Sequence, residues 1–210
     1  MKLYDYYRST ASYRVRIALN LKRISYEKLS VHLLKNGGEQ HSPEYLQLNP
    51  QGLVPTLEEN GHVISQSLAI IEYLDEINPS PPLLPPTISG RAEVRSMALM
   101  VACDIHPLNN LRVLSYLREQ FQATEEQIMA WYHHWLKSGF DALEKKLQSL
   151  PGRTSFCYGT EVTLADICLI PQIYNANRFN FSMAPYPIIS EINSYCLSIA
   201  GFKDAVPKEE

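Results

Sequence analysis

The sequence lacks long hydrophobic runs, is poor in glycine, and has no large excess of charge of either sign. Its 210 residues carry a formal net charge of −3, so no bulk field draws the chain to nucleic acid or to anionic lipid. No apolar stretch approaches the roughly 20 residues that a membrane helix needs. Met1-Lys2 leads into a strand-like stretch and not into a signal-peptide pattern. We therefore expect a cytoplasmic protein with neither a nucleic-acid partner nor a membrane partner.

Cysteine is also scarce, and its spacing excludes the common metal and disulfide patterns. The four cysteines are Cys103, Cys157, Cys168 and Cys196. They contain no C-x-x-C pair and no metal-ligand spacing. The adjacent His133 and His134 point apart on a helix and make a poor metal pair, and no glycine-rich phosphate loop is present. We expect reduced thiols, no metal and no nucleotide.

The first third of the chain alternates short strand and helix signals. Asn60-Gly61, between two β-prone runs, predicts a hairpin, because a type I′ turn needs positive φ at both positions. The expected order is β-α-β-α-β-β-α, with strands in Lys2–Tyr7, Tyr26–Leu33, Val54–Glu59 and His62–Ile64 and helices in Ser12–Lys22, Pro43–Leu48 and Ser67–Ile77. This order predicts a small α/β sheet domain.

Beyond this domain the chain changes character. Five prolines between Asn78 and Thr87 indicate a stiff linker, and after them only helical periodicity is found. Pro107 interrupts the first helical stripe, and Thr163 with Asp166 forms a variant capping box in which Asp166 is a structural cap. We expect a domain over residues 1–80, a linker over 81–87 and an all-helical domain over 88–210.

Several motifs resemble those of the zeta-class glutathione transferases. Residues 8–19, R-S-T-A-S-Y-R-V-R-I-A-L, are similar to the class signature R-S-S-C-x-x-R-V-R-I-A-L. Thr10 stands in place of the second serine and Ala11 in place of the cysteine. Further matches occur at residues 49–57, 66–74, 105–111, 163–166 and 175–179. The resemblance covers nearly the whole chain and implies the glutathione transferase fold, an α/β thioredoxin-like N-terminal domain followed by an all-α C-terminal domain.

The resemblance implies a glutathione site with Ser9 as the activating hydroxyl and Thr10 beside it as a catalytic residue. A hydroxyl donor and a helix N-terminus both stabilise a thiolate, and the chain has no cysteine here, so the ligand must supply the thiol. The binding residues implied are Ser9, Thr10, Ala11, Ser12, Gln40, Val54, Gln66, Ser67, His106, Asn110 and Leu111. Among the serines, Ser12 is expected to be the pure helix cap.

Each of these assignments has a purely structural alternative. Val54-Pro55 is a candidate cis bond that would expose the Val54 backbone to the ligand, or it merely starts an edge strand. Gln66-Ser67 sits at a helix start, where Ser67 would cap the helix and its amides would hold a carboxylate. His106-Pro107 would face the cleft, or would only kink the helix.

The resemblance further implies a diacid substrate held by three arginines, Arg8, Arg112 and Arg178. Arginine suits this role because its planar fork binds both oxygens of a carboxylate; the alternative is that these are ordinary surface arginines. Arg14 and Arg16 are expected to pair structurally within the first helix.

The implied activity is the glutathione-dependent cis–trans isomerisation of maleylacetoacetate to fumarylacetoacetate, in tyrosine and phenylalanine breakdown. Maleylpyruvate as the substrate, conjugation of glutathione to electrophiles, and a non-enzymatic module on the same fold are the alternatives. The class also implies a homodimer with two-fold symmetry.

Overall fold

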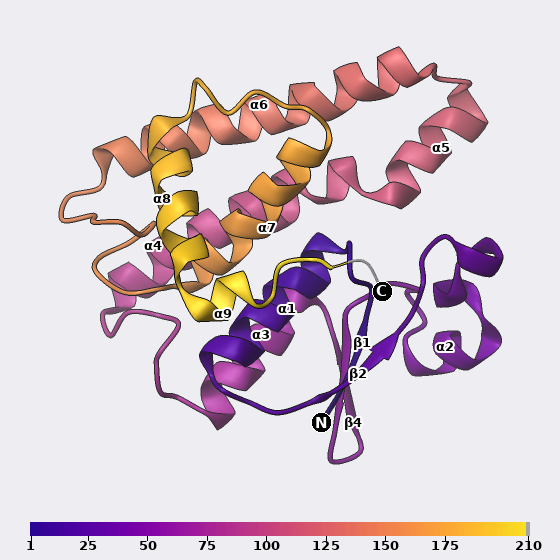
Figure 1. Ribbon diagram of the computed structural model, residues 1–210, viewed down its shortest axis with the longest axis horizontal. Helices are drawn as coiled ribbons and strands as arrows, with labels where there is room; N and C mark the ends of the chain where they lie inside the picture. Colours follow the sequence, from indigo (N-terminus) through magenta and orange to yellow (C-terminus); the bar gives the residue numbers. More distant parts are fainter. Residues whose placement is uncertain (209–210) are drawn as a thin grey trace. The chain divides into compact units, whose positions relative to one another are not determined.

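The computed structural model describes residues 1–208 and divides the chain into two compact units (Figure 1). The first unit contains Met1–Leu83 together with the residues from Leu197 onward, and the second contains Leu84–Cys196. The sequence predicted that all of 88–210 belongs to the helical domain, so the C-terminal segment departs from that division. Short helix α9 (Ala200–Lys203) packs on α1 (Thr10–Leu21), which explains why this segment groups with the first unit.

The first unit is built on a four-stranded sheet with the order β2-β1-β3-β4. Strand β1 (Lys2–Asp5) pairs in parallel with β2 (Glu27–Ser30) and antiparallel with β3 (Thr56–Glu59), which forms a hairpin with β4 (His62–Ser65). Asn60 and Gly61 have φ values of 49° and 78°. The predicted hairpin and its turn are thus confirmed.

Two layers of helices cover this sheet, α1 and α3 (Ser67–Ile77) on one face and α2 (Pro43–Leu48) on the other (Figure 1). Alternation along β1 explains the arrangement, because Leu3 is fully buried while the ring of Tyr4 packs edge-on against Tyr45 of α2. The α1/α3 side forms the main core, from Leu3, Val15, Ile17, Leu19, Leu57, Ile70, Ile71 and Leu74.

A buried lysine ties the proline-rich segment to the first unit. The Lys22 ammonium is fully buried and donates to the Asp75 carboxylate, to the Asn78 carbonyl at 2.6 Å and to the Pro81 carbonyl. A buried ammonium needs such a full set of acceptors because desolvation penalises an unpaired charge. The chain between α3 and α4 (Ile88–Leu99) is therefore anchored at its start.

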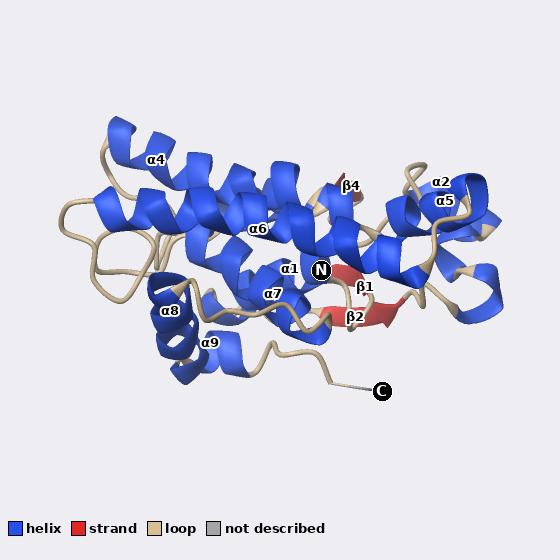
Figure 2. Cartoon of the chain, turned by 90° about the horizontal axis from the view of Figure 1, so that it is seen from above, coloured by secondary structure: helices blue, strands red, loops and turns tan. Residues whose placement is uncertain are grey.

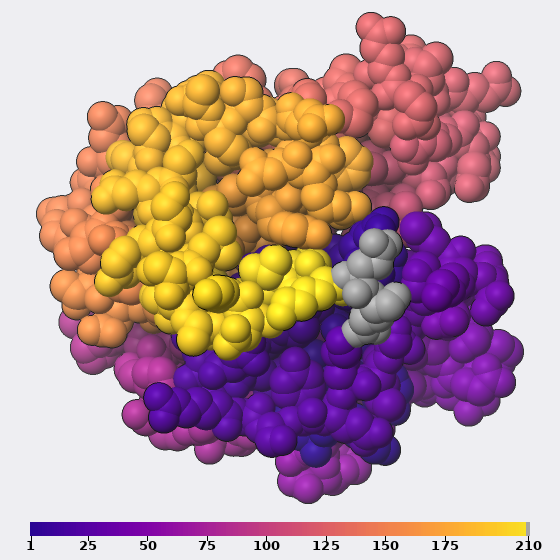
Figure 3. Space-filling view, in the orientation of Figure 1, coloured from indigo at the N-terminus to yellow at the C-terminus, as the bar shows by residue number. Residues whose placement is uncertain are grey.

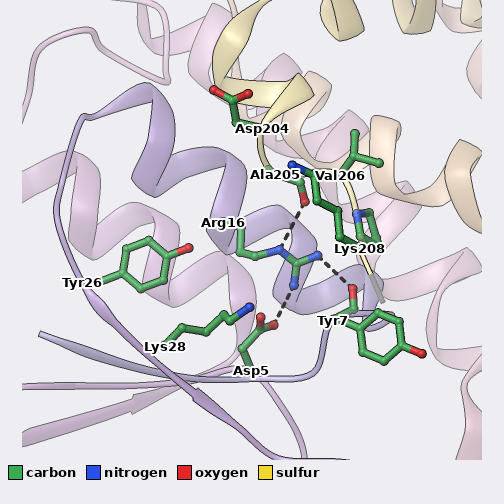
Figure 4. A pocket seen from close by; sticks show the side chains of 10 residues that line it. Asp5, Tyr7, Arg16, Tyr26, Lys28, Asp204, Ala205, Val206 and Lys208 are labelled. Atoms are coloured by element: carbon green, nitrogen blue, oxygen red, sulfur yellow. Dashed lines mark hydrogen bonds and ion pairs between the residues drawn. The ribbon is translucent and has the colours of Figure 1, made fainter. Parts of the chain in front are cut away.

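Another buried ion pair holds the C-terminal segment. Arg16 of α1 donates to the Asp5 carboxylate at 2.7 Å, to the Tyr7 carbonyl at 3.0 Å and to the Ala205 carbonyl at 3.2 Å (Figure 4). Burial raises the pKa of Asp5, while the charge of Arg16 opposes this rise. Figure 3 shows the segment after α9 lying along the surface of the first residues of the chain.

The second unit contains helices and loops only, in every residue from 84 to 196, as Figure 2 shows and as the sequence predicted. Besides α4 it contains α5 (Leu111–Phe121), α6 (Glu125–Ser149), α7 (Leu164–Arg178) and most of α8 (Pro187–Ser198). A π-helical turn over Met100–Ile105 and a 3₁₀ turn over Pro107–Asn109 separate α4 from α5. The predicted break at Pro107 is thus confirmed.

Helix α7 passes through the core of the second unit, and Asp166 fixes its start. The Asp166 carboxylate is fully buried and accepts hydrogen bonds from the Cys157 N–H at 2.7 Å, the Thr163 N–H at 2.8 Å and the Thr163 hydroxyl at 2.9 Å. These bonds confirm Asp166 as the predicted structural cap. The same bonds tie the loop that contains Cys157 to the helix.

Candidate functional site

The turn between β1 and α1 places Ser9 at the N-cap of α1. Helix α1 begins at Thr10, two residues earlier than predicted, and the Ser9 hydroxyl accepts the Ser12 N–H at 3.2 Å. The expectation that Ser12 is the cap is therefore wrong: Ser12 is a fully buried residue of the first turn, and its amide is the group that Ser9 caps. Because Ser9 accepts with its oxygen, its own O–H proton is left for a group outside the helix.

Thr10 and Ala11 occupy the first two positions of the same helix. Amides at these positions have no acceptor within an α-helix, and the helix dipole adds partial positive charge there. The Thr10 side chain is buried and Ala11 is half-buried. The structure thus brings Ser9 to Ser12 together at one helix start that favours an anion.

The start of α3 differs, because the side chain of its N-cap residue makes no capping hydrogen bond. Gln66 occupies the N-cap position with φ of 72° and ψ of 116°, and its amide donates to the Gln51 side chain at 2.8 Å. A positive φ at a non-glycine residue is strained and is typical of functional positions. Ser67 is the first helical residue and not the cap, so the predicted capping role of Ser67 is wrong.

Arg14 links these two helix starts. Its buried guanidinium donates to the Ser67 hydroxyl at 3.3 Å, and α1 packs against α3. The prediction that Arg14 and Arg16 pair within the first helix is therefore wrong in its partners. Arg14 reaches α3, and Arg16 reaches β1 and the C-terminal segment. Arginine is long enough to satisfy distant acceptors, which helical spacing alone does not reveal.

Gln40 has an acceptor without a partner. Its side chain is buried, its Nε2 donates to the Leu33 carbonyl at 3.4 Å, and its Oε1 has no hydrogen-bond partner among residues 1–208. Gly38 makes room for it, since a Cβ on Gly38 would lie 2.5 Å from Gln40 Nε2. A buried orphan acceptor costs free energy unless a ligand or water donates to it.

Val54 lies two residues before the start of β3, and the Val54-Pro55 bond is cis as predicted. Two buried side chains hold the preceding residue, since the Tyr45 hydroxyl and the Asn49 amide both donate to the Leu53 carbonyl, at 2.6 and 2.8 Å. Both side chains also contact the Thr56 hydroxyl. Hydrogen bonds therefore fix the chain at Leu53, before Val54, and at Thr56, after it.

A cavity of about 260 Å³ lies elsewhere in the first unit, between the sheet and the C-terminal segment (Figure 4). Arg16, Lys28 and Lys208 line it together with Asp5 and Asp204. None of the predicted site residues lines it. The Arg16 guanidinium there is already bound to Asp5, Tyr7 and Ala205, so we assign this cavity wall a structural role.

Arg8 is the last predicted site residue of the first unit, and its guanidinium stands 5.1 Å from the Tyr7 ring centre. The remaining predicted residues lie in the second unit. His106 is half-buried between the π-helical and 3₁₀ turns. Asn110 is the N-cap of α5 and accepts the Arg112 N–H at 3.1 Å, while Leu111 and Arg112 are exposed. Asn110 therefore precedes the helix that begins at Leu111.

Arg178 is exposed at the last residue of α7. Its guanidinium donates to the side-chain oxygen Oδ1 of Asn175 at 3.1 Å and stands 5.6 Å from the Phe179 ring centre. The motifs pointed to Arg178 but not to the contacts made by Asn175, Arg14 and Gln51, although all three lie inside motifs, so their position was a signal. Nothing marked Gly38 beyond its neighbours.

The histidines and tryptophans of α6 make structural contacts, and His133 and His134 differ in burial. His134 is exposed, whereas His133 is half-buried and its Nε2 bonds the Phe179 carbonyl at 2.8 Å. Trp131 and Trp135 pack edge-on against each other. Within residues 1–208, no group of three or more metal-ligating side chains is found, and no helix there is long and apolar enough to cross a membrane.

The fold agrees with the matches to known proteins. The glutathione S-transferase N-terminal domain matches residues 3–82. A probable maleylacetoacetate isomerase of Vibrio cholerae is 46% identical over 99% of this chain and 96% of that protein. The holo structure of a maleyl pyruvate isomerase, described as a bacterial zeta-class glutathione S-transferase, has a TM-score of 0.96 at 47% identity and covers 99% of this chain and 97% of that chain.

A third match is the maleylacetoacetate isomerase of Methylobacterium extorquens with bound malonate and glutathione. Its TM-score is 0.95 at 39% identity, with 99% of this chain and 96% of that chain covered. The chain therefore belongs to the maleylacetoacetate isomerase family of zeta-class glutathione transferases.

Proposed function

We propose that this protein catalyses the glutathione-dependent cis–trans isomerisation of maleylacetoacetate to fumarylacetoacetate. The N-terminus of α1 carries this proposal: a hydroxyl-capped helix start holds a position for a thiolate, while every cysteine of the chain lies at residue 103 or later. The thiol must then come from a ligand. Glutathione, when bound, supplies a thiolate that adds to the alkene, allows rotation about that bond, and leaves.

The first unit supplies groups that fit glutathione. The uncapped start of α3, with Gln66 and Ser67, offers amides to a carboxylate, and the orphan Oε1 of Gln40 offers an acceptor to an N–H group. Val54 offers its backbone to the peptide part. The Ser9 hydroxyl donates a hydrogen bond to the sulfur. The amides of Thr10 and Ala11 favour the charged form of the thiol.

In the second unit, His106, Asn110 and Leu111 complete the glutathione and substrate contacts in our proposal. Arg112 and Arg178, together with Arg8 of the first unit, bind the two carboxylates of the diacid. Cationic groups also stabilise the negative charge that addition pushes onto the substrate carbonyl. Exposure of Arg112 and Arg178 supports this role, because neither guanidinium is enclosed in the core.

Maleylpyruvate is the second candidate substrate, because the similarity to a maleyl pyruvate isomerase structure is as high as that to the maleylacetoacetate isomerases. Both substrates are cis-alkene diacids. An absorbance assay with maleylacetone, with and without glutathione, tests the activity class. Turnover that does not depend on glutathione, or only conjugation without isomerisation, would overturn the proposal.

Replacing Ser9 by alanine tests the thiolate assignment. Loss of a hydrogen bond to a charged group costs about 1.5–3 kcal/mol, so we expect turnover to fall roughly 10- to 100-fold with little change in KM for glutathione. The fold also loses a helix cap, at about 1 kcal/mol. Thr124→Ala removes the cap of α6 and serves as the stability control with activity intact. Unchanged turnover in Ser9→Ala would end the assignment.

Gly38 and Gly37 form a matched pair for the Gln40 contact. Both have positive φ, 98° and 78°, so alanine strains the backbone at either position. A methyl group at Gly38 meets the Gln40 side chain, whereas one at Gly37 meets nothing within 4 Å. We expect Gly38→Ala to weaken glutathione binding several-fold in titration calorimetry and Gly37→Ala to leave it close to wild type. Equal affinities would exclude Gln40 from the site.

Arg178→Met and Arg8→Met test the diacid contacts. Removing one charge-assisted contact of about 1.5–3 kcal/mol is expected to raise KM for maleylacetone roughly 10-fold or more, with KM for glutathione nearly unchanged. Exposed Arg91, outside the motifs, provides the control Arg91→Met. Equal loss of affinity for both ligands would assign the arginines to the fold or to the glutathione site.

We further propose that the protein is a cytoplasmic homodimer. Exposed aliphatic side chains support the dimer: Val63 and Ile77 in the first unit, and Ile88 and Leu99 in the second. Where such side chains form a contiguous patch, an assembly commonly covers them. Analytical ultracentrifugation at micromolar concentration is expected to give the mass of two chains, and a monomer there would contradict this proposal.

A further inference from the structure

A chain of buried polar groups runs from the middle of α6 to Arg178 in the second unit. The Tyr132 hydroxyl accepts a hydrogen bond from Asn175 Nδ2 at 2.6 Å, and Asn175 Oδ1 accepts one from Arg178 Nη1 at 3.1 Å. Tyr132 is fully buried and Asn175 is 9% exposed, whereas Arg178 is exposed. An anchored amide therefore holds one end of an arginine that reaches the surface.

The chemistry of arginine fixes the direction of this chain. A guanidinium only donates hydrogen bonds, so the carbonyl end of the Asn175 amide must face Arg178, and its NH₂ end must face Tyr132. The phenol oxygen accepts there. A primary amide supplies an acceptor on one side and donors on the other, and asparagine is the shorter of the two amide side chains. The arrangement thus specifies asparagine.

Ring packing reinforces the same contacts. The Phe179 ring stacks on the Tyr132 ring, with the two ring centres 4.1 Å apart. The Arg178 guanidinium lies over the same Phe179 ring, 5.6 Å from its centre. Burial raises the pKa of the Tyr132 hydroxyl, and the positive charge of Arg178 acts against this rise. Tyr132 thus stays a neutral phenol beside the arginine.

The same turn of α6 also holds the segment that contains His106. The Tyr132 carbonyl accepts from the Asn109 side chain at 3.1 Å, and the Trp131 indole donates to the Leu108 carbonyl at 2.8 Å. One turn of α6 therefore bonds both the 3₁₀ turn before Asn110 and the end of α7. These are the two parts of the second unit to which we assign substrate contacts.

We propose that Asn175 and Tyr132 are positioning residues that hold the Arg178 guanidinium ready for a substrate carboxylate. This inference rests on the proposed function, because it gives Arg178 a carboxylate to bind. A long exposed arginine otherwise loses rotamer freedom when it binds. Fixing it beforehand by a buried amide removes part of that cost.

A double-mutant cycle between Asn175→Ala and Arg178→Met tests the inference. In Asn175→Ala we expect KM for maleylacetone to rise about 3- to 10-fold, with kcat and KM for glutathione within twofold of wild type. In the Arg178→Met background, Asn175→Ala is expected to change KM less than twofold, because the residue it positions is already gone. Exposed Asn177→Ala, on the same helix, is the matched control with wild-type KM.

Tyr132→Phe provides the second variant, since it keeps the ring and removes only the oxygen that anchors Asn175. It is expected to raise KM in the same direction by about 2- to 5-fold. Titration of malonate into the glutathione-loaded protein gives a readout without turnover, and its Kd should follow the same pattern.

The outcomes separate the inference from the proposed function. If Arg178→Met leaves KM unchanged, the proposed role of Arg178 fails, and the inference fails with it. If Arg178→Met raises KM but Asn175→Ala and Tyr132→Phe do not, only the positioning inference is overturned. It is also overturned if the effects of Asn175→Ala and Arg178→Met multiply independently, or if Asn175→Ala lowers stability and kcat in both backgrounds alike.

Discussion

The first amides of every α-helix need acceptors that the helix itself does not supply, and the way each helix meets this need organises the molecule. Helix α1 uses the Ser9 hydroxyl, α6 uses Thr124, and α7 uses the buried Asp166 carboxylate. The N-cap residue of α3, Gln66, makes no side-chain capping bond and adopts a strained backbone. Where the fold leaves this need unmet, a ligand with a carboxylate can meet it.

Two predicted site residues turn out to be helix caps as well. Ser9 caps α1 with its oxygen, and Asn110 caps α5 with its side-chain carbonyl. A cap uses only the accepting atom, so the Ser9 proton and the Asn110 NH₂ group remain to donate. The same bond that stabilises the helix also fixes the direction of the donor. A structural role and a functional role of such a residue are therefore compatible.

Local features of the fold were predictable from sequence because they depend on neighbouring residues. The Asn60-Gly61 turn, the break at Pro107 and the Thr163–Asp166 start of α7 all follow from backbone preferences within four residues. The start of α1 was misplaced by two residues because three closely spaced hydroxyl-bearing candidates, Ser9, Thr10 and Ser12, compete for one cap. Only the turn geometry after β1 decides among them.

Contacts between residues distant in sequence were not predictable in this way. Arg16 bonds the Ala205 carbonyl across 189 residues, so the C-terminal segment joins the first unit although its helical pattern resembles that of the second. Within the candidate site, the motifs led to Ser9, Gln66 and Arg178 but not to what holds them. The need for glycine at position 38 follows only from the structure, in which the Gln40 side chain occupies the space that a Cβ would take.

The two units contribute different kinds of groups to the function that we propose. The first unit offers amides, hydroxyls and a backbone edge, with Ser9, Gln40 and Val54 held by neighbouring elements. Such neutral groups suit a peptide, since they match its own amides without adding charge. The second unit offers guanidinium groups at Arg112 and Arg178, exposed at a helix start and a helix end. In a protein of net charge −3, a dianion gains nothing from the overall field. Under the proposed function, recognition of a dianion depends on where a few cations are held, and a buried asparagine that bonds an exposed arginine contributes to that placement.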